Sequence, residues 1–241
     1  MFVPSNAEIL AVWERARVQG PAARALTLLG AVSPLETLEQ LHAVSIGERD
    51  ARLLQLREQL FGAEMPSVAT CPECQTRLEF TLNARALSHE SVPASVQRVS
   101  VGEMELVLRP VNAGDLVAAS SCPTHAEARR VLCERCVVEA RRGDTAISFA
   151  AIDRQAIEEV SAALAAADPG AELVIDVGCA SCAHRWQVVF DVVAFLWTEI
   201  DALARRLLSE VHALAWAYGW READILGLSE ARRRFYLERV S

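Results

Sequence analysis

Apolar positions in the N-terminal part of the chain recur with a helical period. Leu53, Leu54 and Leu60 lie on one stripe of this kind, and Gly62 follows it as a stop signal. We therefore predict that the chain is helical through about Phe61.

Three Ser-x-x-Glu capping boxes mark helix starts in this region. In such a box the serine oxygen accepts a backbone N–H of the first turn, and the glutamate reaches back to the cap. The boxes are Ser5 to Glu8, Ser33 to Glu36 with Pro34 at the first helical position, and Ser45 to Glu48.

The period then changes to two, which is typical of half-buried strands. Residues 77–82 alternate in this way, and residues 95–110 contain two predicted strands around Gly102. Further strands are predicted at residues 172–177 and 185–190.

Helical spacing returns in several later segments. Asn112 caps a predicted helix at residues 113–120, and the Thr124 to Glu127 capping box opens a second one that runs to about Arg141. An alanine-rich helix is predicted from about Asp153 to Ala166, and a long helix from Val192 to about Ala217. We expect a turn at Tyr218-Gly219-Trp220, a short helix at residues 222–226, and a last helix from Glu230 to Val240 capped by Ser229.

Composition and charge narrow the classes of function. The 241-residue chain is 52% hydrophobic and 23% charged, as in an ordinary globular protein, and its formal net charge of −8 argues against nucleic-acid binding. The N-terminus lacks a secretory pattern, and the most apolar run, VVFDVVAFLW, is interrupted by Asp191 and is too short to cross a bilayer. We expect a soluble, cytoplasmic protein with no membrane association.

Two CxxC motifs form the most specific chemical signal. CPEC supplies Cys71 and Cys74, and CASC supplies Cys179 and Cys182. Each motif is a tight turn flanked by strand-like sequence, and two such turns facing each other supply the four soft ligands that zinc prefers. We predict one structural zinc on these four cysteines, which closes the base of the long insertion between the motifs.

Other interpretations of the cysteines stay open. CPEC also resembles a redox dithiol, although such motifs precede a helix and this one precedes a strand. Both pairs could simply be reduced and buried, and His184 is an alternative metal ligand. Cys133 and Cys136 form a third CxxC inside a predicted helix, and for them, as for Cys122, packing in the core is the better interpretation.

These elements predict an α+β protein with N-terminal helices, a central zinc-ribbon-like β element with an α/β insertion, and a C-terminal long helix and helical hairpin. We expect an N-terminal helical segment at residues 1–64, the central element at 65–191 with its insertion at about 92–170, and a C-terminal helical region at 192–241. We find no nucleophile elbow, phosphate-binding glycine loop, HExxH motif or paired catalytic carboxylates, so the sequence predicts neither an enzyme nor a small-molecule substrate.

The chain resembles a known family. IGERDARLLQLREQLFG, CPECQTRLEFTL and LRPVNAGDL, followed by the run from CASCAHRW to the C-terminus, are similar to the baseplate hub assembly chaperones of T-even-like phages, which have relatives in extracellular contractile injection systems. The resemblance covers roughly residues 45–241. It implies a non-enzymatic assembly factor or minor structural component that acts with baseplate hub or wedge proteins.

Aromatic and arginine residues near the C-terminus are the candidate partner contacts. Trp220, Arg232, Phe235 and Tyr236 combine the residue types that anchor interfaces, and the arginines would suit an acidic partner surface. We expect the other two tryptophans of this region, Trp197 and Trp216, to lie in the core. The rival functions are a zinc-ribbon adaptor for nucleic acid or a transcription complex, and a thiol oxidoreductase that uses Cys71 and Cys74.

Overall fold

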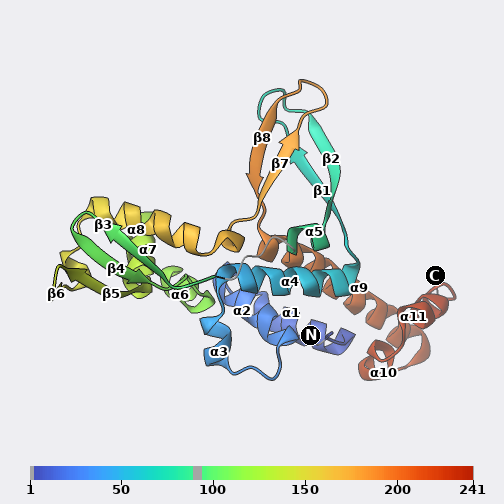
Figure 1. Ribbon diagram of the computed structural model, residues 1–241. Coiled ribbons are helices and arrows are strands. Elements are labelled where there is room, and N and C mark those ends of the chain that lie inside the picture. The colour runs from blue at the N-terminus through green and yellow to red at the C-terminus, as the bar shows by residue number, and fades with distance from the viewer. Residues whose placement is uncertain (1–2, 89–93, 241) are drawn as a thin grey trace. The chain divides into compact units, whose positions relative to one another are not determined.

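The computed structural model describes residues 3–88 and 94–240 and confirms the α+β class (Figure 1). The chain forms two compact units. The first combines the residues up to Pro34 with those from Val193 onward, and the second comprises Leu35–Val192.

The first unit is helical. Its helices are α1 (Asn6–Ala16), α2 (Pro21–Val32), α9 (Val192–Tyr218), α10 (Glu222–Leu226) and α11 (Glu230–Leu237). The Ser5 to Glu8 capping box is confirmed at the start of α1. The indole Nε1 of Trp13 donates to Asp201 Oδ1 at 2.7 Å, which ties α1 to α9.

The long helix α9 follows its predicted apolar spacing. Its buried side chains include Leu196, Ile200, Leu207 and Leu214. The helix ends where Gly219 adopts a φ of +67°, in the predicted turn. Within the described ranges, no helix combines the length and apolar character that a membrane crossing requires.

The start of helix α4 (Ile46–Phe61) and the residues just before it contact both ends of the insertion in the second unit. The N–H of Ala113 donates to Val44 O at 2.9 Å, and Asp168 Oδ2 accepts the N–H of Gly47 at 2.9 Å. A Cβ at position 47 would overlap Asp168 Oδ1 and lie 2.9 Å from the backbone of Gly170, so only glycine fits here. Asp168 therefore caps a helix that begins more than a hundred residues earlier in the chain.

One of the predicted capping boxes is wrong. Ser33 follows α2 as its C-cap, and the next helix, α3 (Leu38–Ala43), begins after the N-cap Thr37. Glu36 binds the guanidinium of Arg52 instead of a helix start, with the Arg52 Nη1–Glu36 Oε1 distance at 2.9 Å. The third box is confirmed in part, because Ser45 caps α4 by accepting the N–H of Glu48.

The insertion is a four-stranded antiparallel sheet packed against helices on one face. The strands, in sheet order, are β3 (Gln97–Val101), β4 (Met104–Leu108), β5 (Val137–Arg142) and β6 (Thr145–Ala146), and the helices are α6 (Ala113–Ala119), α7 (His125–Cys136) and α8 (Arg154–Ala167), with short 3₁₀ turns at Phe149–Ala151 and Pro169–Ala171. Its core includes Leu106, Leu108, Val160 and Leu164. Asn112 caps α6 as predicted.

The helix predicted from Thr124 to about Arg141 is too long, because its last residues form strand β5. It ends at Cys136, whose carbonyl accepts the N–H of Arg109 at 3.0 Å. The following residues form β5 and pair with β4. This tertiary pairing, together with the β-branched Val137 and Val138, outweighs the local helix preference.

Two further antiparallel hairpins carry the CxxC motifs. One consists of β1 (Glu64–Thr70) and β2 (Arg77–Asn83), is followed by the short helix α5 (Ala84–Ser88), and is a sheet by itself. The other consists of β7 (Val174–Gly178) and β8 (Arg185–Val189) and is also a sheet by itself. The sequence predicted three of these four strands, whereas β1 was missed.

Candidate metal centre

The two CxxC turns have the same backbone geometry, and we call each of them a knuckle. In the first, the N–H of Cys71 donates to Thr76 O at 3.0 Å and the N–H of Gln75 donates to Cys71 O at 3.0 Å. In the second, the N–H of Cys179 donates to His184 O at 2.8 Å and the N–H of Ala183 donates to Cys179 O at 2.9 Å. The chain thus builds the same turn twice, at the tips of two hairpins.

Each knuckle holds a non-glycine residue in the left-handed region. Gln75 and Ala183, which directly follow the second cysteine of each motif, both have a φ of +59°. A Cβ in this region costs roughly 1–2 kcal/mol. The backbone hydrogen bonds of each knuckle offset this steric cost.

We expect Gln75→Gly and Ala183→Gly each to raise the free energy of unfolding by up to about 1 kcal/mol, because glycine adopts a positive φ without this steric cost. Urea denaturation measures the change. Ala180→Gly, in the same turn but without a positive φ, is the matched control and should lower stability by up to about 1 kcal/mol. Destabilisation by all three substitutions alike would contradict the prediction.

The four predicted cysteines meet at one point. Their sulfurs all lie within 4.8 Å of one another, and in the described part of the chain they form the one such group of three or more potential ligands. Cys71 Sγ lies 3.7 Å from Cys182 Sγ, and Cys74 Sγ lies 3.6 Å from Cys179 Sγ. Both short contacts join one knuckle to the other, and all four cysteines are free thiols.

These separations fit a tetrahedral metal ion. Four sulfurs about 2.3 Å from a central zinc would stand about 3.8 Å apart. A disulfide needs a separation near 2.05 Å, well below the observed distances. The set of four cysteines can therefore hold one metal ion, and tetrahedral thiolate sites take zinc or iron.

Hydrogen bonding at the knuckles changes the acidity of the thiols. The Thr76 hydroxyl, 3.3 Å from Cys74 Sγ, and the Thr76 backbone N–H lower the pKa of Cys74 to about 6. The backbone N–H of Cys182 lowers the pKa of Cys179. The N–H of His184 acts in the same direction on Cys182, but partial desolvation by the surrounding groups and hydrogen bonds to the neighbouring sulfurs outweigh it and raise the pKa of Cys182 to about 12.

The other candidate ligand lies outside this cluster. The imidazole of His184 stacks on Trp186 with ring centroids 5.8 Å apart, while its backbone shapes the knuckle. Cys71 and Cys179 are buried, whereas Cys74 and Cys182 are exposed. The site is thus sheltered on one side and open to solvent on the other.

The third CxxC motif lies in the core, as predicted. Cys133 and Cys136 are buried between α7 and the insertion sheet, and burial raises the pKa of both thiols, that of Cys136 to about 12. A thiol with a raised pKa is a poor nucleophile and a poor metal ligand. Cys122 is half-buried.

A buried cluster of charged side chains beside Cys136 was not predicted from the sequence. Asp115 is fully buried and accepts hydrogen bonds from Arg109 at 2.6 and 2.9 Å and from Arg135 Nε at 2.7 Å. It also accepts the N–H of its helix cap, Asn112, at 3.0 Å. The capping pattern was visible in the sequence, but the arginines come from separate elements.

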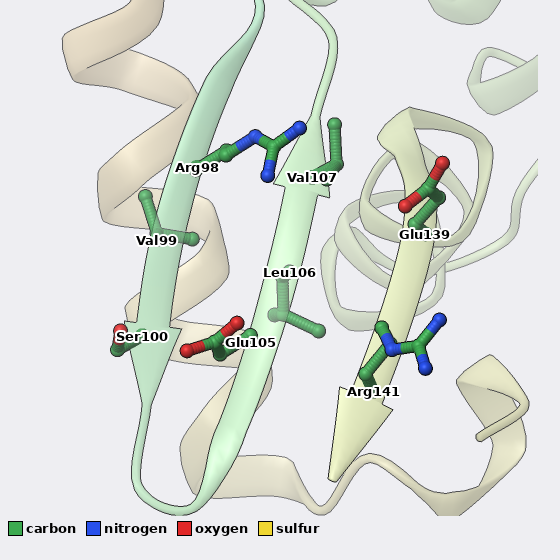
Figure 2. A pocket seen from close by; sticks show the side chains of 8 residues that line it. All are labelled: Arg98, Val99, Ser100, Glu105, Leu106, Val107, Glu139 and Arg141. Carbon is green, nitrogen blue, oxygen red and sulfur yellow. The ribbon is translucent and has the colours of Figure 1, made fainter. Parts of the chain in front are cut away.

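A shallow cleft of about 220 Å³ lies on the open face of the insertion sheet (Figure 2). In the strand register, Arg98, Val107 and Glu139 form one row, and Glu105 and Arg141 lie in the next. Opposite charges therefore alternate across the face. Such a surface is typical of an antiparallel sheet that has helices on its other side only.

The candidate partner contacts divide into two groups. Trp220 and Tyr236 are half-buried and lie against each other, with ring centroids 4.8 Å apart, whereas Arg232 and Phe235 are exposed. The expectation that Trp216 lies in the core is wrong, because 87% of its surface is exposed. Trp197 is half-buried, with the Arg24 guanidinium 4.3 Å from its ring centroid.

Comparison with known proteins places the chain in a family. No curated protein and no solved structure matches it. A family model described as T4 bacteriophage base plate protein matches residues 33–197, which is more than half of the chain and includes both knuckles and the whole insertion. The chain therefore belongs to the T4 bacteriophage base plate protein family.

Proposed function

We propose that this protein is a non-enzymatic assembly factor, or a minor structural component, of the baseplate of a contractile phage tail or contractile injection system. Family membership is the observation that carries the proposal. The protein would act in the cytoplasm of the bacterial or phage-infected cell, where it would bind hub or wedge proteins of the baseplate.

We further propose that one structural zinc per chain is held by Cys71, Cys74, Cys179 and Cys182. The sulfur separations and the matched knuckles support a tetrahedral thiolate site. Bound zinc would join two hairpins that, among the residues the structure describes, form separate two-stranded sheets. Isolated two-stranded hairpins are marginal in water, so the metal would supply the stability that each lacks.

The geometry does not favour the thiol oxidoreductase alternative. A redox dithiol forms its disulfide within one CxxC motif, usually at the N-terminus of a helix. Here the close sulfur contacts run between the two motifs, and a strand follows each knuckle. The zinc-ribbon adaptor alternative has little support at the knuckles either, because Glu79 lies beside Arg77, with 3.6 Å between their charged groups.

The C-terminal hairpin is the proposed contact with the baseplate. We define this hairpin as α10 and α11 together with the end of α9 from Leu214. Within it, Trp220 and Tyr236 would support the contact surface, and Arg232 and Phe235 would touch the partner.

Deletion of the gene from a cluster that encodes a complete contractile tail tests the function. We expect loss of complete baseplates in electron micrographs, and recovery when the gene is supplied separately. Mass spectrometry of purified tails then distinguishes the two roles, since an assembly factor leaves the particle and a component stays. Normal yields of contractile tails without the gene would refute the proposal.

A further inference from the structure

We infer that the C-terminal hairpin docks on an acidic protein surface of the baseplate through one stripe, Arg232, Phe235 and Arg239. This inference rests on the proposed function and names the chemistry of the partner. It also moves the contact away from two of the residues that the sequence suggested, Trp220 and Tyr236.

The interior of the hairpin is complete without a partner. Arg233 is 2% exposed, its Nε lies 2.7 Å from Glu210 Oε2, and its Nη1 donates to Leu228 O at 2.5 Å. Ile225 and Leu214 are fully buried. The middle arginine of the run at 232–234 therefore holds the hairpin together and is unavailable to a partner.

A cluster of aromatic side chains packs against Phe235, the exposed ring of the stripe. Tyr218 stacks on Trp220 with centroids 4.8 Å apart, and Tyr236 meets both rings edge-on. Phe235 packs edge-on against Tyr236, with 5.5 Å between centroids. Because its neighbour is fixed in this cluster, Phe235 has a rigid base and would lose little side-chain entropy on binding.

The stripe lies on one face of α11 and its following turn. Positions 232, 235 and 239 are spaced i, i+3 and i+7, which places them on the same side of a helix. Phe235 is 49% exposed, and the Arg239 guanidinium carbon lies 3.3 Å from its ring centroid. Among the described residues, neither Arg232 nor Arg239 forms an ion pair, unlike Arg234, which reaches Glu230 at 3.3 Å.

Trp216 adds an exposed aromatic ring two residues before the cluster. At 87% exposure it is the most exposed aromatic side chain for which the structure gives a value. It lies about 200° around α9 from Tyr218, so it does not extend the stripe. The stripe itself carries two arginines, a residue type enriched among interface hot spots.

The charge of the stripe selects an acidic partner. Two guanidinium groups flank the exposed ring, and the exposed carboxylate of Glu238 lies beside them in sequence, so the charge of this surface is net positive and an acidic surface would complement it. The chain as a whole carries −8, which disfavours the extended phosphate backbone of a nucleic acid as the partner. A protein surface with carboxylates around an apolar pocket would accept both the guanidinium groups and the ring of Phe235.

The test measures binding between the full-length protein and each purified baseplate protein of the same tail, at low and high salt. We expect an acidic baseplate protein to bind. Phe235→Ala should weaken binding by about 30-fold or more. Arg232→Glu with Arg239→Glu should weaken it further and flatten its salt dependence.

Two matched controls separate the stripe from general effects. Arg221→Glu reverses one charge on an exposed residue of the hairpin outside the stripe and is compared with Arg232→Glu alone, and Val18→Ala removes an exposed apolar side chain, 85% exposed, elsewhere in the same unit. Both should change affinity by no more than about twofold. Circular dichroism must show that every variant retains its helices.

Each other outcome contradicts the inference in a distinct way. Unchanged binding of a baseplate protein by the stripe variants would overturn the stripe and leave the proposed function intact. Self-association that Phe235→Ala abolishes, or tight binding of a single-stranded oligonucleotide, would show that the occupant is a second copy or a nucleic acid. Absence of binding to any baseplate protein, combined with normal tails after gene deletion, would overturn both proposals.

Discussion

Replacing Cys71 and Cys179 by serine is expected to abolish metal binding and to unfold the two hairpins. Elemental analysis of the purified wild type should find about one zinc per chain, and the double variant should contain none. Because metal binding is coupled to folding, we expect the loss of at least about 3 kcal/mol of stability. For a chain of this size, that corresponds to a decrease in Tm of about 6–12 °C.

Hydrogen exchange locates the expected loss. The amides that pair β1 with β2 and β7 with β8 should lose protection in the double variant, while those of the insertion sheet should keep it, because the insertion has its own core. Cys122→Ser, outside the cluster, is the matched control and should keep both the metal and the protection. Full protection in a metal-free double variant would refute the structural role of the metal, and iron in the wild type would keep the site but replace zinc.

The parts of the structure that depend on local chemistry could be predicted from the sequence. The four cysteines were identified because the spacing of each CxxC pair by itself brings two sulfurs together. Helix starts at Ser5, Ser45 and Asn112 were identified because a cap needs only residues three positions apart. Gly62, with a φ of +87°, ends α4 for a similarly local reason.

The parts that depend on distant partners were missed. Strand β5 contains the sequence VVEARR, which suits either a helix or a strand, and its pairing with β4 decides between them. Strand β1 contains Pro66 and few apolar residues, and it forms because β2 lies beside it. The cap that Asp168 provides for α4 has no local signal at all.

The wrong prediction for Trp216 has a different cause, because the helical period of the sequence did indicate that this side chain is exposed. At about 100° per residue, position 216 lies about 200° around α9 from the buried Leu214. The periodicity therefore placed the ring on the outer face, whereas residue type suggested the core. The two criteria disagree at this position, and the helical period decides where the ring lies.

The buried Asp115 should be the most sensitive single residue of the insertion. Asp115→Ala is expected to lower the free energy of unfolding by about 3 kcal/mol at neutral pH, because it leaves two arginines without their shared carboxylate and removes a helix-cap interaction. The effect should lie at the lower end of the range for broken buried pairs, since Arg109 and Arg135 reach solvent in part. Urea denaturation of the variant and the wild type measures it.

The same carboxylate makes a specific prediction about pH. Burial raises the pKa of Asp115, but hydrogen bonds from Arg109, the Asn112 backbone and Arg135 outweigh burial and hold the pKa below its usual range. An aspartate with a depressed folded-state pKa contributes stability above its unfolded pKa of about 3.9 and loses it as the pH falls toward the folded value. The stability difference between the wild type and Asp115→Asn, which can still accept the cap N–H, should therefore be largest near neutral pH and shrink below about pH 4.

Asp144→Ala is the control for this prediction, since Asp144 is an exposed acid in the turn between β5 and β6. It should change stability by less than about 0.5 kcal/mol, with little dependence on pH. If Asp115→Asn were as stable as the wild type at neutral pH, the carboxylate charge would contribute nothing, and the hydrogen bonds alone would hold α6, β4 and α7 together. If the difference persisted unchanged in acid, the depressed pKa of Asp115 would be refuted, because only a group that titrates in this range can lose its contribution there.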